Sequence, residues 1–210
     1  MSHVLRQFHP SFVRSVLPLV LTMSFCLLAL AGCWIPEKFD ARVDVHRDGS
    51  YDFVYDGTLA FAPVLFRADN GFLSQREEDE LRQKAVSFRE ESGYREFRYI
   101  GNGRFKVRAE KHATPGEEYY FMSEGTKLFA VESPGDGMLS IEGVTPAEDI
   151  VRQLSSSEDT LSGTLTVSVP WGAKVLRHNA DREPFFFGLF GDYSWEITDL
   201  QSMPFIEIQL

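Results

Sequence analysis

From residue 39 onward, the chain consists of short stretches in which apolar and polar side chains alternate. In residues 39–46 every second side chain is apolar and its neighbours are charged or polar, which is the period of a half-buried strand. Asp48-Gly49 is a typical turn pair, and residues 51–55 continue the alternation with Tyr and Phe. The pattern predicts a β-hairpin at the start of the folded part.

Further strands are predicted wherever alternation or a short apolar run lies between turns. The second clear hairpin flanks Gly101-Asn102-Gly103. The predicted segments are 95–100, 104–109, 119–122, 127–132, 138–142, 161–169, 174–180, 193–198 and 205–210. Residues 59–66 form an apolar connection that is interrupted by Pro63.

Two helices are expected between these strands. Ser74 and Glu77 have the spacing of a capping box, and Leu81, Ala85 and Phe88 then repeat at helical intervals up to Ser92-Gly93. The pairs Glu78/Arg82 and Glu80/Lys84 have the i,i+4 spacing of ion pairs on an outer helix face. A shorter helix is expected over residues 145–155, which begin with a second capping box and a proline.

Together these segments predict an α+β fold. We expect a curved antiparallel sheet of about eight strands, with two helices packed on one face. Residues 39–210 have the size of a single domain.

The first 32 residues have a different composition. They contain Arg6 and Arg14 but no acidic residue, and residues 16–30 are almost entirely apolar. These are the n-region and h-region of a secretory signal. The alternative is an uncleaved membrane anchor, although the apolar run is short of the roughly 20 residues that a spanning helix needs.

The sequence Leu30-Ala31-Gly32-Cys33 stands where the apolar run ends and favours cleavage. It resembles the lipobox of bacterial lipoproteins, in which signal peptidase II cuts before the cysteine and the thiol carries the lipid. Residues 1–32 are then the signal peptide, Cys33 is the lipidation site, and residues 33–38 are a short tether. Two or three acyl chains such as palmitate would anchor the protein without a spanning segment.

The cysteine count fits this interpretation. The chain has two cysteines, Cys26 in the apolar run and Cys33 in the lipobox. Cleavage would remove the first and lipidation would consume the second. No thiol would then be left for a disulfide, a metal or a nucleophile.

The net charge of the chain and its expected location limit the kinds of molecule that it can bind. Residues 33–210 carry 19 basic and 31 acidic residues, a net charge of −12, and the lysines and arginines are dispersed along the sequence. We expect no nucleic-acid partner and no electrostatic binding to anionic lipid. Trp34 rather than Asp follows Cys33, which in Gram-negative bacteria resembles sorting to the periplasmic face of the outer membrane.

The sequence contains no spacing that is typical of catalysis. His46, His112 and His178 lie in distant segments, and no metal-ligand motif, nucleophile elbow or phosphate loop is present. We expect a non-catalytic protein with no metal and no cofactor.

One segment remains as a candidate binding site. Residues 185–191 contain four phenylalanines and a leucine, which is too apolar for an ordinary exposed loop. Either this loop folds back and caps the core, or it is a lip that touches lipid or lines an apolar pocket. With residues 59–66 it could line a single opening. The contact residues would be Phe185, Phe186, Phe187, Leu189 and Phe190.

The two ends of the mature chain resemble a known family. The strand 164–170, the segment Gly172 to Ala180 with its Asn179-Ala180 step, and the aromatic strand Tyr193 to Ile197 resemble the C-terminal pattern of LppM-like bacterial lipoproteins. The lipobox, the first strand and Asp48-Gly49-Ser50 resemble their opening. This resemblance implies a lipid-anchored α+β domain that binds envelope lipids or glycolipids. Asn179 itself is expected to take a left-handed turn after its strand.

Three functions follow from these observations. The first is a lipid-anchored module that binds an envelope lipid or glycolipid. The second is an envelope assembly or scaffold lipoprotein that meets a protein partner through its apolar patch. The third is a hydrolase of an unfamiliar type.

Overall fold

The computed structural model describes residues 34–92, 94–123, 127–145, 161–185 and 191–210. These residues belong to one compact unit and contain eleven strands and two helices. The strands are β1 (Trp34–Val45), β2 (Tyr51–Phe61), β3 (Glu96–Gly101), β4 (Arg104–Ala113), β5 (Tyr119–Phe121), β6 (Phe129–Gly135), β7 (Met138–Gly143), β8 (Ser162–Ser168), β9 (Lys174–His178), β10 (Tyr193–Ile197) and β11 (Phe205–Gln209). The helices are α2 (Ala62–Asp69) and α3 (Gln75–Ser92).

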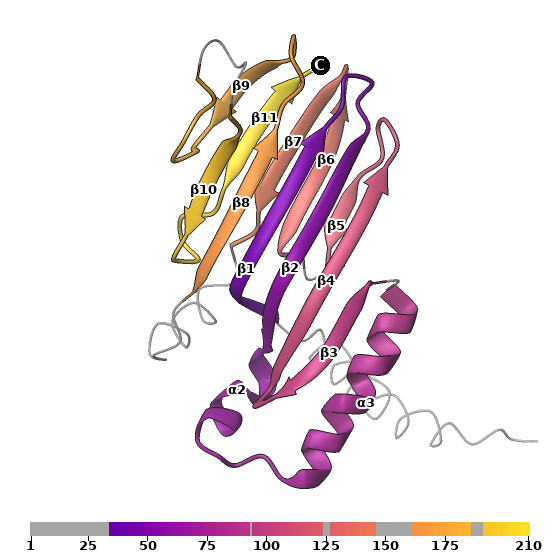
Figure 1. Ribbon diagram of the computed structural model, residues 1–210, viewed down its shortest axis with the longest axis vertical. Coiled ribbons are helices and arrows are strands. Elements are labelled where there is room, and N and C mark those ends of the chain that lie inside the picture. The colour runs from indigo at the N-terminus through magenta and orange to yellow at the C-terminus, as the bar shows by residue number, and fades with distance from the viewer. Residues whose placement is uncertain (1–33, 93, 124–126, 146–160, 186–190) are drawn as a thin grey trace, which may run out of the picture. The chain divides into compact units, whose positions relative to one another are not determined.

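The strands form two sheets rather than the single curved sheet that the sequence predicted (Figure 1). The first has the order β10-β8-β1-β2-β4-β3 and the second has the order β5-β6-β7-β11-β9. Every pair within them is antiparallel except β1 and β8, which run parallel. The α+β description holds at a coarse level, but strands make up most of the described chain.

The two sheets pack face to face through aromatic side chains. Tyr55 of β2 lies 4.3 Å from Phe121 of β5 between ring centroids, and Phe39 of β1 lies 5.7 Å from Phe129 of β6. All four rings are buried. Aromatic side chains at alternate positions along the strands therefore form the core between the sheets.

Helix α3 covers the other half of the same face of the first sheet. Leu81 and Ala85 are buried against it, and the Phe88 ring lies 4.5 Å from that of Phe97 on β3. The predicted capping box is confirmed, because the Ser74 hydroxyl and backbone N–H both donate to the Glu77 carboxylate, at 2.8 and 2.9 Å.

One of the two predicted helix ion pairs is present. Arg82 lies 3.5 Å from Glu78 as expected. Glu80 instead pairs with Arg76, at 2.9 Å, and the Lys84 ammonium lies over the Phe61 ring at 3.9 Å. Partial burial lowers the pKa of Lys84. Packing at the end of the sheet therefore overrides the local helix pairing.

Helix α2 was not predicted, because residues 59–66 were expected to be a connection. The segment instead forms the end of β2 followed by the start of α2. Pro63 stands in the first turn of the helix, where the backbone N–H that proline lacks would have no partner within the helix. Leu65 packs with Ile35 and Ala60 in a small separate cluster, whereas Val64 joins the main core. Helix α2 therefore closes the end of the sheet (Figure 1).

Strand β1 begins at Trp34, five residues earlier than expected. Residues 34–38, predicted as a tether, belong to the sheet, and Trp34 is only 6% exposed. Its ring lies 5.0 to 5.9 Å from those of Phe61, Phe88, Phe97 and Phe105. Aromatic packing therefore draws the start of the folded chain into the core.

We call the end of the first sheet at which β1 begins the Trp34 end. Trp34 pairs with Phe61, and the Phe61 N–H donates to the Gly103 carbonyl at 2.9 Å. The opposite end contains the turn after Val45. The twelve residues of β1 span eleven steps of about 3.3 Å, so the two ends are about 36 Å apart.

The helix expected at residues 145–155 lies almost entirely outside the described residues. Among the residues that are described, no helix is both long and apolar enough to cross a membrane.

Candidate functional site

Most of the residues that the sequence singled out lie outside the described part of the chain. These are Cys33, Phe186, Phe187, Leu189 and Phe190. Phe185 is described, and it is 58% exposed. This one ring of the loop does not cap the core, although its neighbours are not described.

Phe185 and residues 59–66 lie at different ends of the first sheet. Phe185 lies against Gly191, and Tyr193, two residues later, pairs with Val167, which pairs with Val43 near the opposite end. Residues 59–66 lie at the Trp34 end. The expected single opening between them is therefore wrong.

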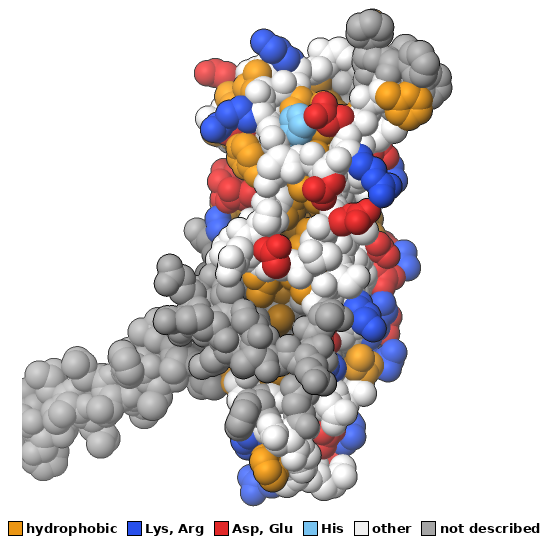
Figure 2. Space-filling view, turned by 90° about the vertical axis from the view of Figure 1, so that its left-hand side faces the viewer, with side chains coloured by type: hydrophobic (Ala, Val, Ile, Leu, Met, Phe, Trp, Pro, Cys, Tyr) orange, Lys and Arg blue, Asp and Glu red, His pale blue; other side chains and the backbone are white. Residues whose placement is uncertain are grey.

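Figure 2 shows the side of the unit that lies at the left in Figure 1. Acidic and basic side chains are interspersed on it, and the visible hydrophobic side chains form separate small groups. The described atoms on this face do not make one large apolar patch.

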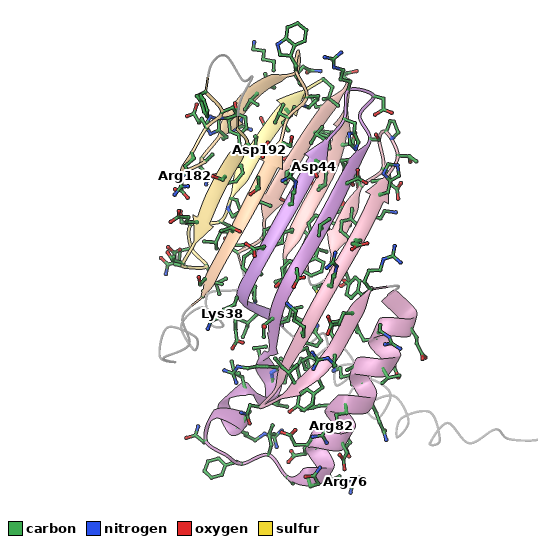
Figure 3. All side chains as sticks on the ribbon, viewed as in Figure 1. Lys38, Asp44, Arg76, Arg82, Arg182 and Asp192 are labelled. Atoms are coloured by element: carbon green, nitrogen blue, oxygen red, sulfur yellow. The ribbon has the colours of Figure 1, made fainter. Side chains whose placement is uncertain are left out.

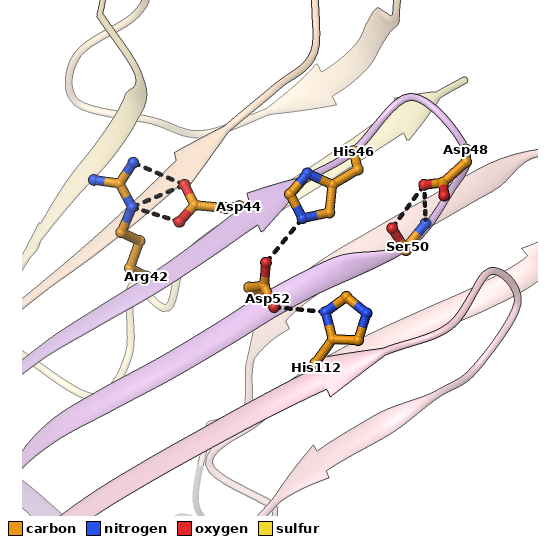
Figure 4. A network of polar contacts seen from close by, with 7 residues as sticks. All are labelled: Arg42, Asp44, His46, Asp48, Ser50, Asp52 and His112. Atoms are coloured by element: carbon orange, nitrogen blue, oxygen red, sulfur yellow. Dashed lines mark hydrogen bonds and ion pairs between the residues drawn. The ribbon is translucent and has the colours of Figure 1, made fainter.

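Two of the histidines that are distant in sequence meet in the structure (Figure 4). Asp52 of β2 accepts a contact of 2.8 Å from His46 Nε2 and one of 2.7 Å from His112 Nδ1, each on a different carboxylate oxygen. His112 is the direct cross-strand partner of Asp52, and His46 follows β1. We call these three residues the His–Asp–His cluster.

The contacts from both histidines lower the pKa of Asp52. The nearby Ser50 hydroxyl donates to Asp48 at 2.6 Å, so it is held by the turn and not by a histidine. Among the described residues, no group of His, Cys, Asp and Glu is arranged to hold a metal ion. The cluster bridges three chain segments, namely β2, β4 and the turn after β1.

Only the pairing of His46 with Asp52 could have been predicted from the sequence. The predicted hairpin around Asp48-Gly49 brings His46 close to Asp52 once its register is known. The place of β4 beside β2 was not predicted, so His112 could not be added. The third histidine of residues 33–210, His178 of β9, lies 3.7 Å from Glu183.

Asn179 has a structural role, but for a different reason from the expected one. It is not among the described residues with positive φ. Its side-chain oxygen accepts hydrogen bonds of 2.8 Å from Trp195 Nε1 and from the Phe205 backbone N–H, and its amide donates to the Met203 carbonyl at 2.9 Å. Asn179 therefore links the end of β9 and the start of β11 to the middle of β10.

A groove of about 470 Å³ lies between α3 and β3. Helix α3 contributes Arg82, Ala85, Val86 and Arg89, and the opposite wall is residues 95–99. Ala85 and Phe97 are buried at its base, whereas Val86 is 51% exposed. The groove therefore combines an apolar base with a charged rim.

Four arginines line this groove: Arg82, Arg89, Arg95 and Arg98. Arginines that are dispersed along the sequence thus come together around one groove, which Glu96 also lines. Figure 3 shows Arg82 on the helix, with Arg76 nearer the helix start.

Three of the four arginines have exposed carboxylate partners. Arg82 lies 2.6 Å from Asp79 and 3.5 Å from Glu78, Arg95 lies 3.0 Å from Glu110, and Arg98 lies 3.1 Å from Glu96. Arg89 makes no ion pair with any described residue. Exposed pairs of this kind contribute about 0–1 kcal/mol each, so an incoming anion can compete for these guanidinium groups.

No model of a known protein family matches this chain, and no curated protein matches it in sequence.

Proposed function

We propose that this protein is a lipid-anchored lipoprotein of the bacterial envelope and a non-catalytic module that binds an envelope lipid or glycolipid. In a Gram-negative cell it would lie on the periplasmic face of the outer membrane. The resemblance to LppM-like lipoproteins is part of this proposal.

The position of the lipobox carries the proposal. Cys33 immediately precedes Trp34, which is buried and already part of β1. An acyl chain on Cys33 would therefore be joined to the sheet without a flexible linker. The Trp34 end would face the bilayer, and the opposite end, with Phe185, would point away from it.

The filled interior supports binding at the surface. The space between the sheets is occupied by contacting rings such as Tyr55 and Phe121. The groove between α3 and β3 offers an apolar base at the half of the sheet that contains Trp34. A lipid of the same membrane would be close to it.

Metabolic labelling with an alkyne-bearing fatty acid tests the anchor. Cys33→Ser should abolish labelling and leave the signal uncut by the lipoprotein peptidase. Cys26→Ser is the matched control, because it removes the other cysteine and should leave labelling and cleavage intact. Labelling that persists in Cys33→Ser would disprove the lipobox.

A second function is favoured by the exposure of Phe185. If the anchor is at the Trp34 end, this ring is presented away from the membrane, where a protein of the envelope could bind it. The alternative is therefore an assembly or scaffold lipoprotein. Under it, Phe185→Ser would release the protein partner and leave labelling of Cys33 unchanged.

A further inference from the structure

We propose that the groove between α3 and β3 binds the anionic phosphate headgroup of a phospholipid, with the first carbons of an acyl chain lying on Val86. This inference rests on the proposed lipid-binding function and names its site and the class of its ligand. It also reverses the sequence expectation that anionic lipid would not be bound.

The rim of the groove has the chemistry of a phosphate site. A guanidinium presents a planar fork of donors that matches two phosphate oxygens, and it stays charged at every physiological pH. Four such groups surround the groove, and Arg89 has no competing ion pair among the described residues. The side chains of Arg82, Arg95 and Arg98 are 51, 71 and 64% exposed and so are accessible.

The base of the groove explains why the ligand is a lipid and not a free anion. Ala85 and Phe97 lie buried beneath the groove, and Val86, which is 51% exposed, supplies the accessible apolar surface beside them. Covering such a surface with hydrocarbon is favourable, at about 25 cal/mol per Å². A phosphate bound to glycerol and acyl chains uses both rim and base.

The groove is also close to the expected membrane attachment point. The Phe97 ring lies 5.5 Å from the Trp34 ring, edge to face. Trp34 is the residue after Cys33. A lipid in the same leaflet as the anchor would therefore meet the groove without the protein leaving the membrane.

An acidic peptide is the competing occupant, since β3 is an edge strand. The strand has only six residues, and Glu96 and Arg98 place charges along it. Short, charged edge strands resist pairing with another strand. These features favour the phospholipid.

Calorimetric titration of the full chain in a neutral detergent tests the proposal. The probes are dihexanoyl phosphatidylglycerol, dihexanoyl phosphatidylcholine, inorganic phosphate and a hexaglutamate peptide. We expect phosphatidylglycerol to bind at least tenfold more tightly than the other three. Arg89→Gln with Arg98→Gln should weaken its binding tenfold or more, and Val86→Ser should weaken it about threefold.

Arg76→Gln with Arg177→Gln is the matched control, because it removes the same charge outside the groove and should change the affinity less than twofold. All substituted side chains are exposed, and equal melting midpoints will establish that each variant folds. Tighter binding of the peptide, equal binding of inorganic phosphate, or equal losses in the control would overturn the proposal. Fatty-acid labelling measures lipidation of Cys33 independently of ligand binding. A protein that is lipidated but does not bind phosphatidylglycerol would contradict the groove proposal alone.

Discussion

Tyr55 has a hydroxyl with no hydrogen-bond partner in the described part of the chain, although its side chain is completely buried between the sheets. Burial raises its pKa well above the ordinary tyrosine value, so the hydroxyl stays protonated. A buried, unpaired hydroxyl costs about 1–3 kcal/mol. The ring contributes to the core while its oxygen opposes folding.

Tyr55→Phe should therefore leave the free energy of unfolding unchanged or raise it by up to about 2 kcal/mol. Tyr51→Phe is the matched comparison, because the Tyr51 hydroxyl donates to the Glu117 carbonyl at 2.9 Å. That substitution should cost about 1 kcal/mol. Urea denaturation measures both, and a loss in Tyr55→Phe equal to that in Tyr51→Phe would show that the hydroxyl is satisfied.

Asp52 makes the stability of the fold depend on pH. Because its folded-state pKa is lowered, its contribution is complete above the ordinary Asp value of about 3.9 and is lost as the pH falls through the folded-state pKa. Asp52→Asn should lower stability at pH 7 by at most about 1 kcal/mol, since the site is exposed. The difference from the parent should disappear in strong acid.

Unfolding curves at pH 7 and near pH 2 measure this difference. Asp136→Asn is the control, because Asp136 lies on the exposed turn between β6 and β7 and its carboxylate has no bond to a described residue. A gap between Asp52→Asn and the parent that stays constant from pH 7 to pH 2 would contradict the assigned cause.

At the scale of elements, two glycines set the packing of β1. Phe39 pairs with Gly57 on β2 and with Gly163 on β8. A Cβ built on Gly163 would overlap the Phe39 ring. The ring stacks on Tyr55 at 5.4 Å, so the absence of a side chain at Gly163 allows this aromatic contact between strands.

Gly163→Ala should cost about 1–3 kcal/mol, which is typical of overpacking in a core. Ser162→Ala, one residue earlier and exposed, should stay within about 0.5 kcal/mol of the parent. Adding Phe39→Leu to Gly163→Ala should recover part of the loss, because the smaller side chain leaves room for the methyl group. Thermal and urea unfolding of the parent, Gly163→Ala, Phe39→Leu and the double variant would detect this, and full additivity of the two changes would argue against the contact.

Alternation identified these elements well but did not identify their partners. Every predicted strand from residue 95 to residue 142 is present to within a few residues, because a period of two reports which side chains face inward. The parallel pairing of β1 with β8 leaves no such mark in either strand. Gly163 would have indicated this pairing only if its place beside Phe39 had been known.

At the scale of the whole folded unit, the main error was to expect one sheet. The inward rings of β2 and those of β5 and β6 have the same pattern, so the sequence did not reveal that they face each other. The arginine groove was missed for a related reason. Arg82 and Arg98 lie on a helix and a strand, and only their packing brings them together. A site made by one continuous segment, such as the proposed lipobox, leaves its pattern within that segment of the sequence.

The pairing of β1 with β8 also determines the order in which the fold can form. Asp40 and Thr164, which are hydrogen-bonded across this pair, are 124 residues apart in sequence. As the chain emerges, β1 can pair with β2 through a five-residue turn, but its other edge stays open until β8 arrives. Contacts of such long range are typical of proteins that fold in milliseconds to seconds. Until then, β1 carries a charge at every second position, on Lys38, Asp40, Arg42 and Asp44. Charges of this kind keep an unpaired strand edge from pairing with another chain.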